Sequence, residues 1–120
     1  MKTYSFEKLL VWQKSRKLAG AVYKTTLRFP KEELFGLSSQ MRRCSVSIAS
    51  NIAEGSGRQT FKEKARFTEI AYASALELLN QLIISSDLEY ITEENYIKLR
   101  TEIEEITFML DALRKSQINN

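Results

Sequence analysis

The chain has 120 residues, of which 43% are hydrophobic and 28% are charged, with one cysteine and no histidine. This length suits one domain with one core, and a lone cysteine excludes an internal disulfide. Without histidine, the chain lacks the commonest general base and every Ser-His or Cys-His nucleophile pair. We therefore expect no enzyme activity, no catalytic or metal-binding residues and no cofactor.

The charge is unevenly placed. Residues 1–66 hold 14 basic and 5 acidic residues, whereas residues 67–120 hold 4 basic and 10 acidic ones. This asymmetry indicates an anionic partner, unless the two halves neutralise each other within the fold. The N-terminus lacks the apolar core of a signal peptide, and no run approaches the roughly 18 apolar residues of a membrane span. We therefore expect a cytoplasmic protein that makes no use of a membrane.

Hydrophobic residues recur at helical spacing in four segments, residues 8–28, 37–54, 61–88 and 93–115. In the first segment, the apolar positions from Val11 to Phe29 fall on one arc of about 140°. Pro30 ends this helix, because its ring disfavours a helical conformation of the residue before it. In the linker that follows, we expect Leu34 and Phe35 to pack under the end of the helices.

The second segment carries its apolar residues on one narrow stripe. The stripe consists of Leu37, Met41, Cys44, Ile48 and Ile52. This position predicts that Cys44 is a small buried hydrophobe rather than a nucleophile. Gly55 is predicted to take the left-handed conformation just past the end of the helix.

The third segment begins at a predicted capping box, in which Thr60 and Glu63 each satisfy a free backbone N–H. Two apolar stripes, about 120° apart, cover roughly half of this helix, more than the roughly 100° of a peripheral helix. The second stripe consists of Phe61, Ala65, Tyr72, Leu76, Leu79 and Ile83. The helix is therefore expected either to lie centrally or to offer its second stripe to another subunit.

The fourth segment is capped by Thr92, and its apolar residues from Tyr96 to Leu113 recur at coiled-coil-like spacing. Residues 116–120 are expected to fray. Four helices with mostly short connections pack best as an all-α, up-down-up-down antiparallel four-helix bundle. We predict one such domain over residues 1–120, assembling as an oligomer.

The most informative basic feature lies in the first helix, where no acidic residue occurs between Glu7 and Glu32. Lys17, Lys24 and Arg28 fall within about 40° of one another on its polar face. The acidic fourth helix could pair with them, within or between subunits; the other candidate is an external anion. Because aromatic residues interleave poorly with these cations, a nucleic acid would be bound by its backbone.

A second basic group follows Gly55, where free N–H groups at a helix start could suit a phosphate. The spacing is not that of a phosphate-binding loop, and the two glycines could simply let the chain reverse. The candidate nucleic-acid or anion-binding residues of both groups are Lys14, Lys17, Lys24, Arg28, Arg58, Lys62 and Lys64.

Residues 40–58, with NIAEG at residues 51–55 as the most specific part, resemble the bacterial proteins encoded in intervening sequences of 23S rRNA genes. The resemblance extends over nearly the whole chain. It implies a four-helix bundle that assembles as a homopentamer, and it supplies no catalytic residue. A related branch comprises accessory proteins of diversity-generating retroelements, which implies nucleic acid and a reverse transcriptase as further partners.

Within this segment, Arg43, Asn51, Glu54 and Gly55 are the structural signature residues. Glu54 opposes the dipole at a helix C-terminus, so we expect it to pair with Arg58 or Arg43. A structural network around Asn51 is favoured over a ligand site. The predicted function is a non-enzymatic oligomeric bundle that binds RNA or DNA. The alternative is a protein–protein interaction scaffold with no nucleic-acid role, whose basic and acidic halves meet across subunits.

Overall fold

The protein is described by a computed structural model that covers all of residues 1–120. Four α-helices make up most of the chain, two short 3₁₀ segments precede α1 and α2, and there is no strand. The elements are η1 (Ser5–Lys8), α1 (Leu10–Thr26), η2 (Lys31–Glu33), α2 (Leu37–Ser56), α3 (Phe61–Asp87) and α4 (Glu93–Ile118). The all-α prediction is confirmed. None of these helices has the length and apolar character needed to span a membrane.

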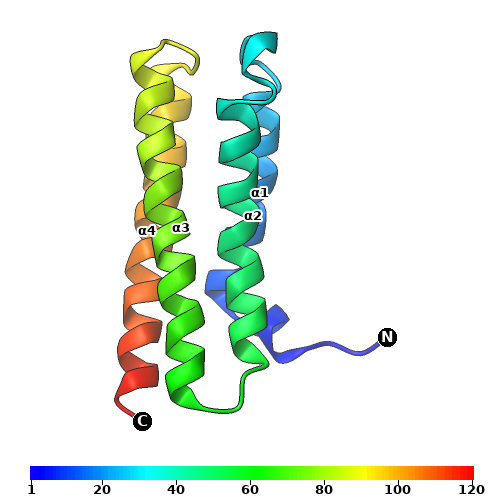
Figure 1. Ribbon diagram of the computed structural model, residues 1–120, viewed down its shortest axis with the longest axis vertical. Coiled ribbons are helices and arrows are strands. Elements are labelled where there is room, and N and C mark those ends of the chain that lie inside the picture. The colour runs from blue at the N-terminus through cyan, green and yellow to red at the C-terminus, as the bar shows by residue number, and fades with distance from the viewer.

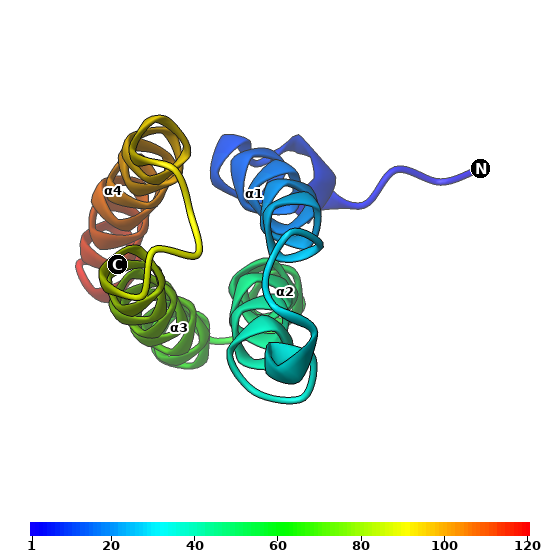
Figure 2. The same ribbon diagram turned by 90° about the horizontal axis from the view of Figure 1, so that it is seen from above.

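The four helices lie side by side along the longest dimension of a molecule that measures 45 × 32 × 22 Å (Figure 1). Each helix has two neighbours: α2 packs on α1 and α3, and α4 packs on α3 and α1 (Figure 2). The α1–α2 and α3–α4 connections lie at one end of the molecule, and the α2–α3 connection lies at the other. This packing is that of a four-helix bundle.

The predicted apolar stripes form the core, because each stripe faces the centre of the group of helices. All four helices contribute to it, including Leu18, Val22, Met41, Ile48, Ile52, Leu78, Leu82, Leu99, Ile103, Ile106 and Leu110. Burying each side chain of this size contributes about 1.5–3 kcal/mol. Several serines are buried together with these residues, and the Ser15 hydroxyl donates to the Val11 carbonyl at 2.7 Å.

Helix α3 is peripheral rather than central, since it contacts only α2 and α4. Its first stripe consists of Phe67, Ala71, Ser74, Leu78 and Leu82, of which Ala71, Leu78 and Leu82 are fully buried. Much of the second stripe lies at the surface. Phe61, Leu76 and Ile83 are 50%, 47% and 36% exposed, respectively. Of the two arrangements expected for this helix, the structure therefore has the one that leaves an apolar face open.

Five helix ends differ from the predicted ones: α2 ends two residues later and α3 one residue earlier than expected, and the other three ends belong to α1 and α4. α1 begins at Leu10 because the preceding residues form η1, where the Tyr4 N–H donates to the Glu7 carboxylate at 2.8 Å. It ends at Thr26, after which the backbone hydrogen bonds join residues three positions apart instead of four. α4 continues to Ile118 instead of fraying after residue 115, because Thr68 on α3 donates to the Gln117 side chain at 2.7 Å.

Two predicted N-caps are present. The Thr60 hydroxyl accepts from the Glu63 N–H at 3.1 Å, and the Thr92 hydroxyl accepts from the Asn95 N–H at 3.2 Å. The Glu63 carboxylate does not return a bond to the Thr60 N–H, so only half of the predicted capping box forms.

The prediction for Gly55 was wrong. This residue lies buried in the last turn of α2, and no glycine of the chain has a positive φ. A Cβ built on Gly55 would lie 2.8 Å from the Cβ of Phe67 on α3. Glycine is therefore suited to this position because α2 and α3 approach closely there. The chain reverses direction only after this residue. The one non-glycine residue with a positive φ is Glu89, at 62°, between α3 and α4.

The expectation that Leu34 and Phe35 pack under the helices was also wrong, since they are 49% and 93% exposed. Their expected place is taken by Phe29 and Tyr90, whose ring centroids lie 5.4 Å apart. The Tyr90 hydroxyl donates to the Glu33 carboxylate at 3.0 Å, which holds the α3–α4 connection against η2.

Candidate nucleic-acid interface

The basic residues of α1 differ in whether they have an acidic partner. Lys14 Nζ lies 2.6 Å from Glu105 Oε1 of α4. Lys17, Lys24 and Arg28 are exposed and take part in none of the five ion pairs of the chain. The acidic fourth helix thus neutralises one cation of this face and leaves three available to another anion.

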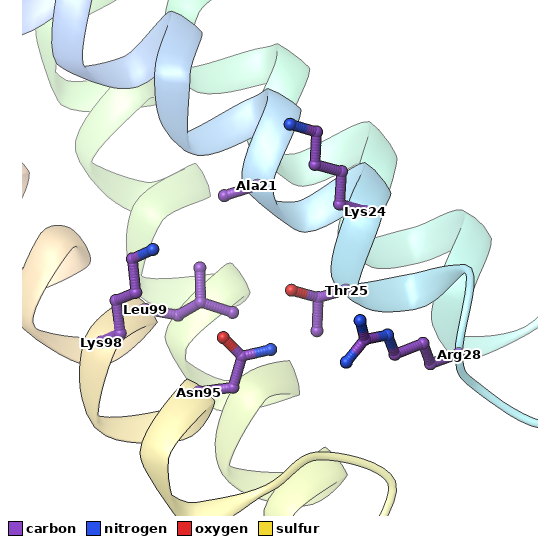
Figure 3. Close-up of a pocket in the computed structure, with 7 residues that line it drawn as sticks. All are labelled: Ala21, Lys24, Thr25, Arg28, Asn95, Lys98 and Leu99. Carbon is purple, nitrogen blue, oxygen red and sulfur yellow. The ribbon is translucent and has the colours of Figure 1, made fainter.

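Lys24 and Arg28 line a groove of about 230 Å³ between α1 and α4, together with Lys98 of α4 (Figure 3). The groove also holds the polar side chains of Thr25 and Asn95, over the apolar Ala21 and Leu99. No carboxylate is among these seven residues, so three cations from two helices share one concave surface. We call this site the α1–α4 groove.

Sequence reasoning missed Lys98. Its neighbours one turn away on α4 are Glu94 and Glu102, so a helix-by-helix view of charge indicates a solvated, mixed-sign face. Only the packing of α1 against α4 brings it near Lys24 and Arg28. Neither of those glutamates lies within ion-pair distance of Lys98 in the structure.

Lys17 lies outside this groove. It lines a second, larger depression of about 540 Å³ near the start of α1, together with Arg16, Gln13, Trp12 and Glu7. The structure therefore brings together two of the three cations that share a helical face, and it separates the third.

The second basic group, after α2, lies at the end of the molecule opposite to Lys24 and Arg28 (Figure 1). Arg58 Nη2 lies 3.4 Å from Glu54 Oε2, as predicted, and its guanidinium stacks 4.5 Å from the centroid of the Phe67 ring. Lys64 Nζ donates to the Ser56 carbonyl at 3.0 Å.

Lys62 alone of this group is exposed and makes no ion pair. The other two cations, Arg58 and Lys64, serve contacts that close the end of α2 onto α3. Their geometry thus favours the reversal of the chain over an anion site at this turn.

Asn51 takes part in a polar network between α2 and α3. Its side-chain amide donates to the Ser47 carbonyl at 2.8 Å and to the Ser47 hydroxyl at 3.0 Å. The Ser47 hydroxyl in turn shares a hydrogen bond with the Ser74 hydroxyl of α3 at 3.0 Å. This agrees with a structural role. Arg43 is exposed, without an ion pair, at the mouth of a polar pocket beside this network.

Cys44 is buried, as predicted, and its thiol donates to the carboxylate of Glu77 on α3. Burial and, second, this hydrogen bond raise the pKa of Cys44 to about 11. The thiol is therefore protonated near neutral pH and is a poor nucleophile. Sequence reasoning missed Glu77, which is 33 positions away along the chain. No group of three or more His, Cys, Asp or Glu side chains is placed to hold a metal ion.

Comparison with known proteins places this chain among proteins of the same fold. The crystal structure, at 1.70 Å resolution, of a protein with unknown function from the S23 ribosomal protein family of Bacteroides thetaiotaomicron VPI-5482 is similar. The two share 28% sequence identity and a TM-score of 0.80, over 88% of this chain and 99% of that one. No curated protein matches the chain. The model of the family described as 23S rRNA-intervening sequence protein matches residues 7–112, and the chain therefore belongs to this family.

Proposed function

We propose that the protein is a non-enzymatic, homo-oligomeric bundle of up-down-up-down topology that binds the phosphate backbone of RNA or DNA in the cytoplasm. The observation that carries this proposal is the absence of an internal partner for Lys17, Lys24 and Arg28. Cations left exposed without counter-charges repel one another, and phosphates would relieve that repulsion.

RNA is the first nucleic acid to test, since the family to which the chain belongs is named after 23S rRNA. Binding would be driven by charge and by counterion release rather than by contacts with bases, because few aromatic side chains accompany the cations. It would therefore have little sequence preference and would weaken steeply with salt.

Self-association is supported by the exposed part of the second stripe on α3. Phe61, Leu76 and Ile83 present an apolar surface that a second subunit would cover. Homopentamer is the assembly implied by the resemblance of residues 40–58, and light scattering on a size-exclusion column measures it directly. A monomer under all conditions would contradict this part of the proposal.

The binding experiment is a fluorescence anisotropy titration with single-stranded and duplex RNA over a series of salt concentrations. Changing Lys17, Lys24 and Arg28 together to Glu should abolish binding. A matched control changes Lys2, Lys8 and Lys115 to Glu, which alters net charge equally at positions outside α1. The control should retain most of the affinity, and no binding of the unchanged protein at low salt would contradict the proposal.

The second candidate function is an interaction scaffold in which the basic face of one subunit meets the acidic face of the next. The Lys14–Glu105 ion pair favours it, because it joins α1 to α4 by the same kind of contact. This alternative predicts that the oligomer itself dissociates at high salt, whereas RNA affinity is absent throughout.

A further inference from the structure

The pair of helices that borders the α1–α4 groove is the least tightly joined in the bundle. α1 and α4 pack less extensively on each other than the other neighbouring helices do. One ion pair, Lys14–Glu105, links the two helices. It lies several turns from the groove, toward the start of α1.

The charged residues that line the groove all have the same sign. Figure 3 shows Lys24 on α1, Arg28 in the turn that follows α1, and Lys98 on α4. None of the three takes part in an ion pair. Like charges across a poorly packed boundary oppose its closure, and Glu94 and Glu102, one turn from Lys98, relieve this only in part.

The groove also contains polar groups that lack partners. Thr25 is only 8% exposed as a whole, but its hydroxyl is open to the groove and makes no hydrogen bond within the protein, unlike the hydroxyl of its neighbour Thr26, which donates to the carbonyls of Val22 and Tyr23. A hydroxyl that is open to the groove can donate a hydrogen bond to a ligand there. The Asn95 side chain is likewise free of bonds within the chain and faces Thr25 and Arg28 across the groove.

This set of groups is complementary to a tetrahedral oxyanion. Lysine, arginine, hydroxyl and amide groups all donate hydrogen bonds, and bonds from cationic donors are the stronger kind. The groove volume of about 230 Å³ leaves room for a phosphate group with several waters, each of which takes about 30 Å³ in the liquid.

We propose that the α1–α4 groove binds one phosphate group and that this phosphate, by bridging Lys24 and Arg28 to Lys98, holds α1 against α4. The site deepens the proposed nucleic-acid function by naming one phosphate subsite. The phosphate can come from a nucleic-acid backbone or from free inorganic phosphate. Because the bridge needs only the phosphate group, the free ion tests it independently of nucleic acid.

The experiment follows thermal unfolding of the full chain, at fixed protein concentration, in sodium phosphate and in sodium chloride of equal ionic strength. A ligand that binds only the folded state raises the unfolding midpoint as its concentration increases. We expect the midpoint to rise by several degrees between zero phosphate and saturation. Equal midpoints in the two salts would overturn the proposal.

Two variants locate the effect. Lys98→Gln removes the only groove cation on α4, and it should abolish the difference between phosphate and chloride. In low-salt chloride the Lys98→Gln protein should unfold at a higher temperature than the unchanged protein, because the substitution removes the repulsion of Lys98 by Lys24 and Arg28 across the groove. Thr25→Val keeps the shape of the side chain and should weaken the phosphate response. Lys115→Gln on the same helix is the control that should retain it.

A full phosphate response in the Lys98→Gln protein would show that phosphate binds elsewhere, and it would overturn the proposal. RNA binding without any phosphate response would contradict the groove site while leaving the proposed function intact. A phosphate response lost in Lys98→Gln, in a protein that binds no RNA at low salt, would support the groove site and contradict the nucleic-acid function.

Discussion

The two glycines of the helices differ in their surroundings, and the same substitution should affect them in opposite directions. Gly55 in α2 would place a new Cβ 2.8 Å from the Cβ of Phe67, whereas a Cβ on Gly20 in α1 would meet nothing within 4 Å. Both residues are helical, so alanine improves the backbone propensity at each by about 0.5–1 kcal/mol.

At Gly55 this gain is outweighed. The contact joins two Cβ atoms, which are fixed to their backbones, so α2 and α3 have to move apart. Overpacking of this kind costs about 1–3 kcal/mol. Subtracting the propensity gain leaves a net destabilisation of about 1 kcal/mol for Gly55→Ala, against a stabilisation of about 0.5–1 kcal/mol for Gly20→Ala.

Thermal or urea unfolding at one protein concentration measures both variants, and the gap between their midpoints should be about 4 °C or more. In a Phe67→Ala background, Gly55→Ala should still destabilise the protein, because alanine retains the Cβ that the new Cβ would meet. In a Phe67→Gly background, which lacks this Cβ, the destabilisation by Gly55→Ala should disappear. If Gly55→Ala stabilised the protein as much as Gly20→Ala, the close approach of α2 and α3 would be refuted.

Other regions of the chain give further predictions. The thiol of Cys44 should be alkylated slowly at pH 8 in the folded protein. The alkylation rate should rise with pH around a midpoint near pH 11, and this midpoint should be lower in Glu77→Gln. Because the pKa of this thiol is raised from 9.0 to about 11 by folding, the protonated thiol contributes to stability below pH 9, and this contribution is lost between pH 9 and about 11. The Cys44→Ala protein should lack this pH dependence of the free energy of unfolding, which urea titrations at alkaline pH measure. Lys14→Gln should lower stability by less than about 1 kcal/mol at low salt and by nothing measurable at high salt, since its ion pair is partly exposed. Phe35→Ser should leave the unfolding midpoint unchanged within error, because the ring is 93% exposed, and a drop of several degrees would show that it is buried in solution. The hydrogen bond to a carboxylate raises the pKa of Tyr90, so its absorbance should titrate above the ordinary tyrosine range.

The helices and the core could be predicted from the sequence because a helical period is a property of each segment alone. The stripe from Met41 to Ile52 and the seam from Leu99 to Leu110 are buried as their spacing predicts. Thr60 and Thr92 cap the helices they precede, because a cap depends on residues within one turn.

Features that depend on two helices at once could not be predicted in this way. Gly55 has a turn-like sequence context, and only its approach to Phe67 explains a glycine inside the helix. Lys98 joins the basic face of α1 only because of how α4 is rotated against α1. Phe35 belongs to an apolar linker, but Phe29 and Tyr90 already fill the site where it was expected.

The contribution of the exposed cations Lys17, Lys24 and Arg28 can be counted in one measurement, the dependence of nucleic-acid affinity on salt concentration. In a plot of log affinity against log salt concentration, each phosphate contact adds about 0.9 to the slope for duplex DNA and about 0.7 for a single strand. Changing Lys17, Lys24 and Arg28 together to Gln should therefore reduce the slope by about 2–3. An unchanged slope in this variant, measured with the same oligonucleotide as the unchanged protein, would contradict binding through this face.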